Sequence, residues 1–222
     1  MSDSPQGRFV ALDRLRALAV LLMIQGHAFS ELLDREVQSG TWYRLHRLVH
    51  GLTAPMFLMG AGLAFDITTY PRWEVFRAGG SEHRARLRRY ASITLLGYAL
   101  QLPGNSLRAL RSTSPDVWRE ILSVGPLQLI GVTLFAAQLM TRVASGPRQH
   151  ARAALGVAVI IALTAPYAWG VEPGSLDAPL LLAFLNGHTG SQFAAFPWMA
   201  YVLVALALSC AGTTERGHRW LR

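Results

Sequence analysis

The feature that most constrains this chain is a series of apolar blocks. Several of them approach the ~20 consecutive apolar residues with which a helix crosses a bilayer. The whole chain of 222 residues is 51% hydrophobic and only 15% charged. Ordinary soluble domains carry about 25% charged residues, so this composition indicates a membrane protein. We expect an all-α fold, a polytopic transmembrane helical bundle.

Six spans are expected, and polar or proline-containing segments separate them. In chain order these spans cover roughly 12–33, 48–67, 90–102, 121–140, 153–169 and 193–212. The apolar segment at 176–185 is too short to cross, so a re-entrant or interfacial piece is expected there. Pro166 should kink or end the fifth span. We expect one membrane-embedded domain over residues 1–222, which could be the N-terminal part of a larger one.

The basic residues define the expected topology. All 21 of them are arginine, and they gather at the ends of the apolar blocks. The segments 72–89 and 142–152 are rich in arginine, whereas 171–192 contains none. The positive-inside rule then puts both termini in the cytoplasm, in a multi-pass protein of the cell (inner) membrane. Topology explains the arginines better than nucleic-acid binding, so membrane lipid is an expected partner and nucleic acid is not.

The first expected helix carries a polar stripe that is costly in lipid. Asp13, Arg16, Met23, His27 and Glu31 follow one another at helical spacing on one face. A charged group at the bilayer centre costs at least ~2.5–3.5 kcal/mol, so the stripe should face the bundle interior or a water-filled cavity. Glu31 could hold one ring nitrogen of His27 and leave the other as a base. Alternatively, Asp13 and Arg16 pair at the inner interface and Glu31 reaches the outer headgroups.

Two more histidines precede the second apolar block. His46 and His50 are four residues apart, so they share a helix face. Their depth is close to that of the outer half of the first helix, so His50 could approach His27. A bis-histidine metal or haem site is the alternative. No third ligand stands at a recognisable spacing, and no metal is expected.

Candidate substrate-binding residues lie on later helices. Arg88 and Arg89 belong to "SEHRARLRRY" (81–90), just before the third span. They serve topology and anionic lipid, or they clamp the phosphates of a cytoplasmic substrate. Gln128 is polar within the fourth span and hydrogen-bonds either a ligand or another helix. Trp198 is expected to be an interfacial anchor.

Four segments, in order along the chain, resemble one known family. The segment "RFVALDRLRALAVLLMIQGHAFSELL" resembles the first helix of the heparan-alpha-glucosaminide N-acetyltransferase-like membrane proteins. It also resembles the wider transmembrane acyltransferase group that includes acyltransferase family 3. The shared aspartate, arginine and histidine are Asp13, Arg16 and His27, with Ala17 where the family usually has glycine. "GLTAPMFLMGAG", "REILSVGPLQLIGV" and "FPWMAYVLV" resemble later parts of the family.

The resemblance implies acyl transfer across a membrane. The donor would be cytoplasmic acyl-CoA, typically acetyl-CoA as a co-substrate, and the acceptor a sugar amine or hydroxyl on the other side. Histidine would act as base or transient acyl carrier. The acyltransferase-3 relatives point to His27, which we rank first, and the animal enzyme points to His50 or His46. Asp13 and Arg16 would lie where the acyl arm enters the bundle.

Other interpretations remain open at this stage. The same polar stripe could line a path for a proton or a small solute in a transporter or channel-like subunit, which would need no coenzyme. A haem-binding electron carrier is a third interpretation. The sequence is compatible with an oligomer.

Overall fold

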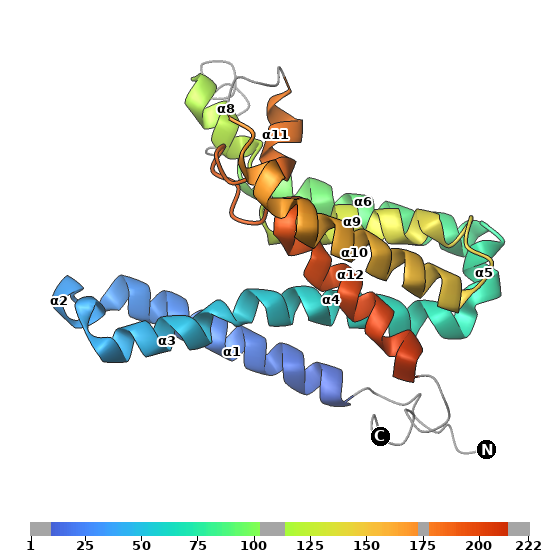
Figure 1. The fold of residues 1–222 in the computed structure, drawn as a ribbon, viewed down its shortest axis with the longest axis horizontal. Helices are drawn as coiled ribbons and strands as arrows, with labels where there is room; N and C mark the ends of the chain where they lie inside the picture. The colour runs from blue at the N-terminus through green and yellow to red at the C-terminus, as the bar shows by residue number, and fades with distance from the viewer. Residues whose placement is uncertain (1–9, 103–113, 173–177, 213–222) are drawn as a thin grey trace.

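The computed structural model describes residues 10–102, 114–172 and 178–212, and these residues form helices and no strand (Figure 1). This confirms the all-α class. The elements are α1 (Val10–Leu32), α2 (Arg35–Ser39), α3 (Thr41–Gly51), α4 (Thr53–Thr69), the 3-10 turn η1 (Tyr70–Arg72), α5 (Trp73–Arg77), α6 (Ser81–Leu100), α8 (Pro115–Ile121), α9 (Pro126–Met140), α10 (Pro147–Trp169), α11 (Pro179–Leu185) and α12 (Ala195–Gly212).

Within the described ranges, three helical stretches are long and apolar enough to cross a membrane. They are Leu12–Leu32, Thr41–Arg77 and Pro147–Trp169. α9 and the segment Ala195–Leu208 are apolar but shorter. The helices thus agree with a membrane protein, while six spans and the orientation of the termini stay predictions. The short segment expected at 176–185 is helical from Pro179 as α11, and its first two residues lie outside the described ranges.

The span expected at 48–67 is divided in the structure. α3 ends at Gly51, and α4 begins at Thr53. The Thr53 hydroxyl donates to the His50 carbonyl at 2.7 Å, directly across the break between the two helices. His46 and His50 therefore lie on a short helix of their own, ahead of the more apolar α4.

The helix that contains the third expected span begins earlier than predicted. α6 begins at Ser81, nine residues before the span predicted at 90–102. Gly79, with φ of +74°, supplies the left-handed turn that ends the preceding helix α5. The arginines that follow are good helix formers, although they are too polar for a hydropathy pattern to include them.

Two prolines behave differently from each other. The span predicted at 121–140 is represented by α9, which Pro126 opens at a first-turn position where its missing N–H has no cost. Pro166 lies inside α10 and does not end it, because the helix continues to Trp169. Pro166 removes one backbone hydrogen bond, to the carbonyl of Ala162, and the last residues of α10 stay helical beyond it.

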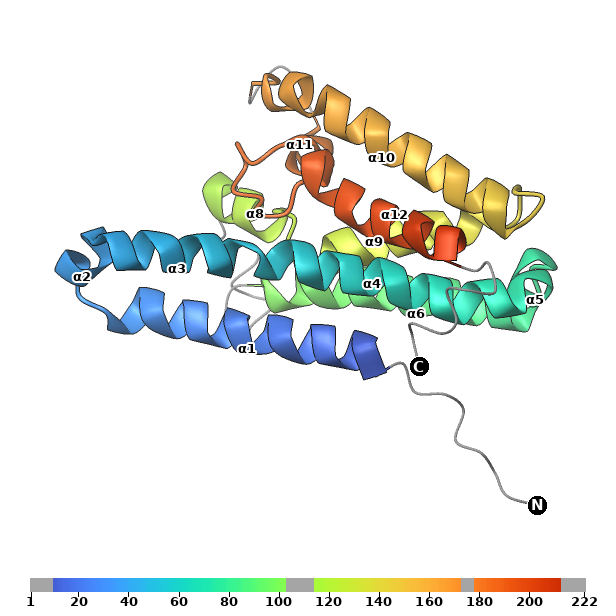
Figure 2. The same ribbon diagram turned by 60° about the horizontal axis from the view of Figure 1, so that its bottom comes forward.

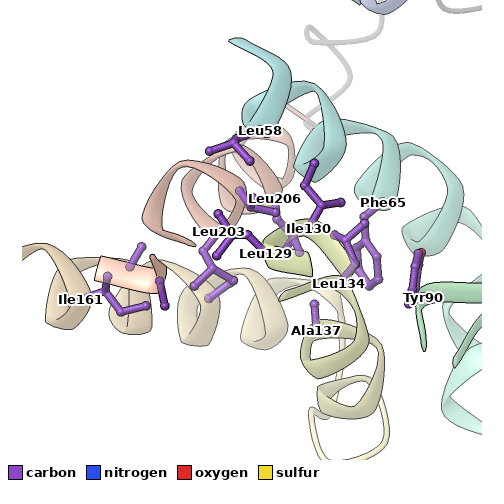
Figure 3. Packing of buried hydrophobic residues seen from close by; sticks show 14 of the residues in the cluster. Leu58, Phe65, Tyr90, Leu129, Ile130, Leu134, Ala137, Ile161, Leu203 and Leu206 are labelled. Carbon is purple, nitrogen blue, oxygen red and sulfur yellow. The ribbon is translucent and has the colours of Figure 1, made fainter. Parts of the chain in front are cut away.

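The core lies where α4, α9, α10 and α12 meet. α12 runs between α4 and α10 (Figure 2), in contact with both. Figure 3 shows the aliphatic and aromatic side chains that converge there from α4, α6, α9, α10 and α12. Leu58, Leu129 and Leu206 are fully buried among them.

Helices α1, α2 and α3 form an arm beside this core. Its α2 end projects beyond the other helices in both views (Figures 1 and 2). α1 packs on α4 along its first half and on α3 along its second half. α2 and α3 contain no buried residue, and the buried residues of α1 in the described part are Ala19 and Gly26.

Of the two expectations for the polar stripe of α1, packing into the bundle interior is not seen in the described structure, and a water-filled cavity stays a prediction. Arg16, His27 and Glu31 are exposed, and Asp13 is half-buried. Because α1 packs through Gly26, the adjacent His27 is turned away by about 100° of helix rotation. The stripe therefore borders the packed face instead of forming it.

Candidate functional site

Three histidines form a row across α1 and α3. The ring centroid of His27 lies 5.8 Å from that of His50, which lies 6.1 Å from that of His46. The expected approach of His50 to His27 is therefore present. His46 and His50 stack with an interplanar angle of 15°, because they are one turn apart on α3. His50 is the middle member and contacts both helices.

His50 lies directly on Gly26 of α1. A Cβ at position 26 would overlap the imidazole, so the ring reaches this position only because residue 26 is glycine. Nδ1 of His50 lies 3.3 Å from the carbonyl oxygen of Leu22. A carbonyl only accepts, so this contact requires the proton on Nδ1. The neutral ring then keeps its lone pair on Nε2, the form that a general base needs.

The backbone beneath the row is held by local hydrogen bonds. Ser30 donates its hydroxyl to the carbonyl of His27 at 2.9 Å, and Thr53 does the same for His50 at 2.7 Å. The Phe29 ring lies 4.7 Å from that of His46. His46 and His50 are half-buried and His27 is exposed, so the row can be reached from outside the packed helices.

The other candidates on α1 lie apart from the row. Glu31 is exposed, and no hydrogen bond joins it to His27 in the part of the chain that the structure describes. The side-chain stem of Arg16 lies beside Gly60 of α4. Arg16 is eleven residues from His27, or about 16 Å along the helix axis. Asp13 and Arg16 are therefore nearer the opposite end of α1.

The candidates on α6 and α9 have other surroundings. Gln128 is 1% exposed, and its amide hydrogen-bonds that of Gln101 at 2.8 Å. This bond supports the helix-to-helix alternative for Gln128. Arg88 and Arg89 are exposed in the first half of α6, and the helix α5 that precedes α6 lies at the opposite end of the molecule from α2 (Figure 1). The structure does not bring them to the histidine row.

A buried polar cluster near α5 was not predicted from the sequence. His150 is 0% exposed; its Nε2 donates to the Ala137 carbonyl at 2.9 Å, and its Nδ1 lies 3.1 Å from the Tyr70 hydroxyl. Asp66 is 1% exposed, and its Oδ2 has no hydrogen-bond partner among the described residues. A lone aspartate in an apolar run was a visible signal for Asp66. Nothing local distinguished His150 from a surface histidine.

His83 belongs to the same region, in the first turn of α6. The Gln138 amide nitrogen lies 3.1 Å from its Nδ1 and donates to it, which requires a ring nitrogen without a proton. Burial lowers the pKa of His83, and the positive charges of Arg142 and Arg84 lower it further. His83 therefore joins α6 to α9 through Gln138, and His150 joins α10 to α9 through the Ala137 carbonyl.

Apolar helices of membrane-spanning length, with a row of histidines on the arm that α1 and α3 form, define a helical protein of the membrane type. The family described as heparan-alpha-glucosaminide N-acetyltransferase, catalytic, matches residues 8–222, and the chain belongs to this family. This confirms the resemblance carried by the four segments. Membership gives the chain a membrane acetyltransferase-type function. Comparison with curated proteins and with solved structures gave no match.

Proposed function

We propose that this chain is a multi-pass acyltransferase of the cell inner membrane. It moves an acetyl group from cytoplasmic acetyl-CoA to the amine or hydroxyl of a sugar on the other side, without a metal. The observation that carries the proposal is the position of His50, with Nδ1 at a backbone carbonyl and Nε2 free to accept a proton. Family membership supports the donor and the acceptor class.

The chemistry assigned to His50 is general-base catalysis. Nε2 removes a proton from the acceptor as the acceptor nitrogen or oxygen attacks the thioester carbonyl. The carbon–sulfur bond breaks, an amide or ester forms, and the thiolate of coenzyme A takes up a proton. His27, which the sequence ranks first among the candidate catalytic histidines, lies beside His50. It is assigned to proton transfer or substrate positioning. His46, the third member of the row, is assigned to the same site, and Glu31 is kept as a candidate on the next turn of α1 after His27.

The donor is assigned to the arginine-rich end. Arg88 and Arg89 are exposed there, and guanidinium groups match the geometry of phosphate oxygens. Asp13 and Arg16, about 16 Å or more from His27 along α1, are assigned to the path of the acyl arm. In this orientation both termini are cytoplasmic, and the α2 end of the arm is outside.

Binding of acetyl-CoA separates the enzyme from a transporter that uses no coenzyme. Calorimetry on the purified, detergent-solubilised chain should give a saturable heat, and replacing Arg88 and Arg89 together by alanine should weaken binding about tenfold. The loss follows from two phosphate-pairing groups. A chain that gives no heat with acetyl-CoA and transfers no acetyl group would contradict the proposal.

Gly26→Ala tests how His50 is held. The added methyl would overlap the ring, which can rotate away but then leaves the Leu22 carbonyl. We expect at least tenfold slower acetyl transfer in membranes, with a melting temperature close to that of the parent protein. The matched control is Gly51→Ala at the end of α3, where a Cβ would have no neighbour within 4 Å. Equal loss in both variants would show that the Gly26 contact has no special role.

A further inference from the structure

His46 and His50 have the spacing of a metal-chelating pair. They lie one turn apart on α3, and their ring centroids are 6.1 Å apart. Two histidines with this spacing on one helix face hold zinc in the helices of metalloproteases. Neutral imidazole is also the most common metal ligand among side chains. The pair therefore provides two nitrogen ligands on a single rigid element.

The distance between the two rings suits a shared ion. Zinc–nitrogen bonds of about 2.0–2.1 Å in tetrahedral geometry place two ligand ring centres roughly 5 Å apart. The observed separation of 6.1 Å is longer than this by about 1 Å. Rotation of the His46 side chain closes this gap, because its ring is only half-buried and accepts no hydrogen bond from the described residues.

His50 already has the orientation of a metal ligand. Its Nδ1 donates to the Leu22 carbonyl, so the lone pair of the neutral ring is on Nε2. Metal-binding histidines commonly donate their second ring nitrogen to a backbone carbonyl in this way, which fixes the tautomer and the direction of the ring. The base and the metal ligand would therefore use the same Nε2 lone pair, so that one use excludes the other.

The surroundings indicate a site with open coordination positions. Among the described residues, no group of three histidine, cysteine, aspartate or glutamate side chains could hold a metal ion. Structural zinc sites have four protein ligands and catalytic zinc sites have three. A pair of histidines thus gives an exchangeable site that water completes, not the site of a resident cofactor. Imidazole suits zinc, copper and nickel, whereas magnesium and calcium prefer oxygen ligands.

We propose that His46 and His50 together bind a divalent transition-metal ion such as Zn²⁺, and that the bound ion inhibits acetyl transfer. Coordination occupies the Nε2 lone pair of His50, which then cannot take the proton of the acceptor. No covalent bond changes, and a chelator restores the free histidines. Binding of the ion requires nothing from the proposed function, whereas the inhibition rests on it. His27, on the other side of His50, is not a ligand in this arrangement.

The binding test is calorimetry with ZnCl₂ on the tag-free, detergent-solubilised full chain. Zn²⁺ should give a saturable heat, and Mg²⁺ should give none. Loss of even an outer-shell partner weakens metal binding about 10–100-fold, so His46→Ala and His50→Ala should each cost at least as much. His188→Ala is the matched control, because His188 is exposed and lies outside the row. His188→Ala and His27→Ala should bind Zn²⁺ like the parent protein.

The inhibition test compares, for each protein, its own rates of acetyl transfer with and without saturating Zn²⁺. The parent protein should be slowed and should recover when EDTA is added. In His46→Ala the two rates should be equal, whatever the metal-free rate is. Mg²⁺ at the same concentration should change neither protein, because it is a poor match for imidazole.

Failure of this inference is distinct from failure of the proposed function. Undetectable Zn²⁺ binding, or binding that His46→Ala leaves unchanged, would overturn the metal site. Zn²⁺ that binds through the pair and does not slow transfer would overturn the inhibition. If Zn²⁺ binds through the pair and the metal-free protein transfers no acetyl group, the metal site stands and the acyltransferase proposal fails.

Discussion

Replacement of His50 by alanine is expected to slow acetyl transfer at least 100-fold. A positioned general base contributes about 10²–10⁴-fold to a rate, equivalent to roughly 3–5 kcal/mol of the barrier. His50 combines the two properties that this role needs. Its Nδ1 faces the Leu22 carbonyl, and its ring lies on Gly26, so Nε2 has a fixed direction. No neighbouring side chain reproduces both contacts in the described part of the chain.

The measurement is acetyl transfer from acetyl-CoA to an amino sugar in membranes, at matched protein levels. The melting temperature of the His50→Ala protein should change little, because the ring is only half-buried and Thr53 bonds the backbone of residue 50 instead of its side chain. His188→Ala is the control, since His188 is exposed and its ring bonds the Trp169 carbonyl far from the row in sequence. Full activity in His50→Ala together with loss in His27→Ala would return the assignment to His27.

Local pattern was sufficient to predict some features of the fold. The apolar block at 12–33 became α1, almost residue for residue, because hydrophobic length alone defines such a helix. The approach of His50 to His27 followed from their similar depth on consecutive helices. Periodicity also showed that Asp13, Arg16 and His27 share one face. It could not show which face of α1 packs, because that depends on how α3 and α4 lie against it.

Contacts between residues far apart in the sequence explain most of the features that were not predicted. Gln128 bonds Gln101, the residue that follows the end of α6, so no local pattern distinguished a contact within the protein from a ligand contact. His150 is buried because Tyr70 and Ala137 close over it from other helices. Hydropathy located only the apolar half of α6 and excluded the arginines that begin it. In each case the deciding partner is distant in sequence.

Gly62→Ala is expected to cause the largest loss of stability. An added Cβ would overlap the Val202 carbonyl oxygen and lie 3.0 Å from the Ala205 Cβ and 3.1 Å from the Leu206 nitrogen. Two of these atoms belong to the backbone of α12, which cannot rotate aside as a side chain can. α12 also cannot move back freely, because α10 packs on its other side. Overpacking of this kind costs about 1–3 kcal/mol, which would lower the melting temperature in detergent by about 3–10 °C.

Gly156→Ala makes the same glycine-to-alanine change and is expected to have the opposite effect on stability. Gly156 is exposed in the middle of α10, and a Cβ there would have no neighbour within 4 Å. Alanine is a better helix former than glycine by up to about 1 kcal/mol, so this variant should melt at or above the temperature of the parent protein. If Gly62→Ala melts no lower than Gly156→Ala, then α4 and α12 are not in the close contact that the core requires. Gly26→Ala and Gly62→Ala should differ in the same way. Gly26→Ala should lower the rate of acetyl transfer with little change in melting temperature, whereas Gly62→Ala should lower the melting temperature first.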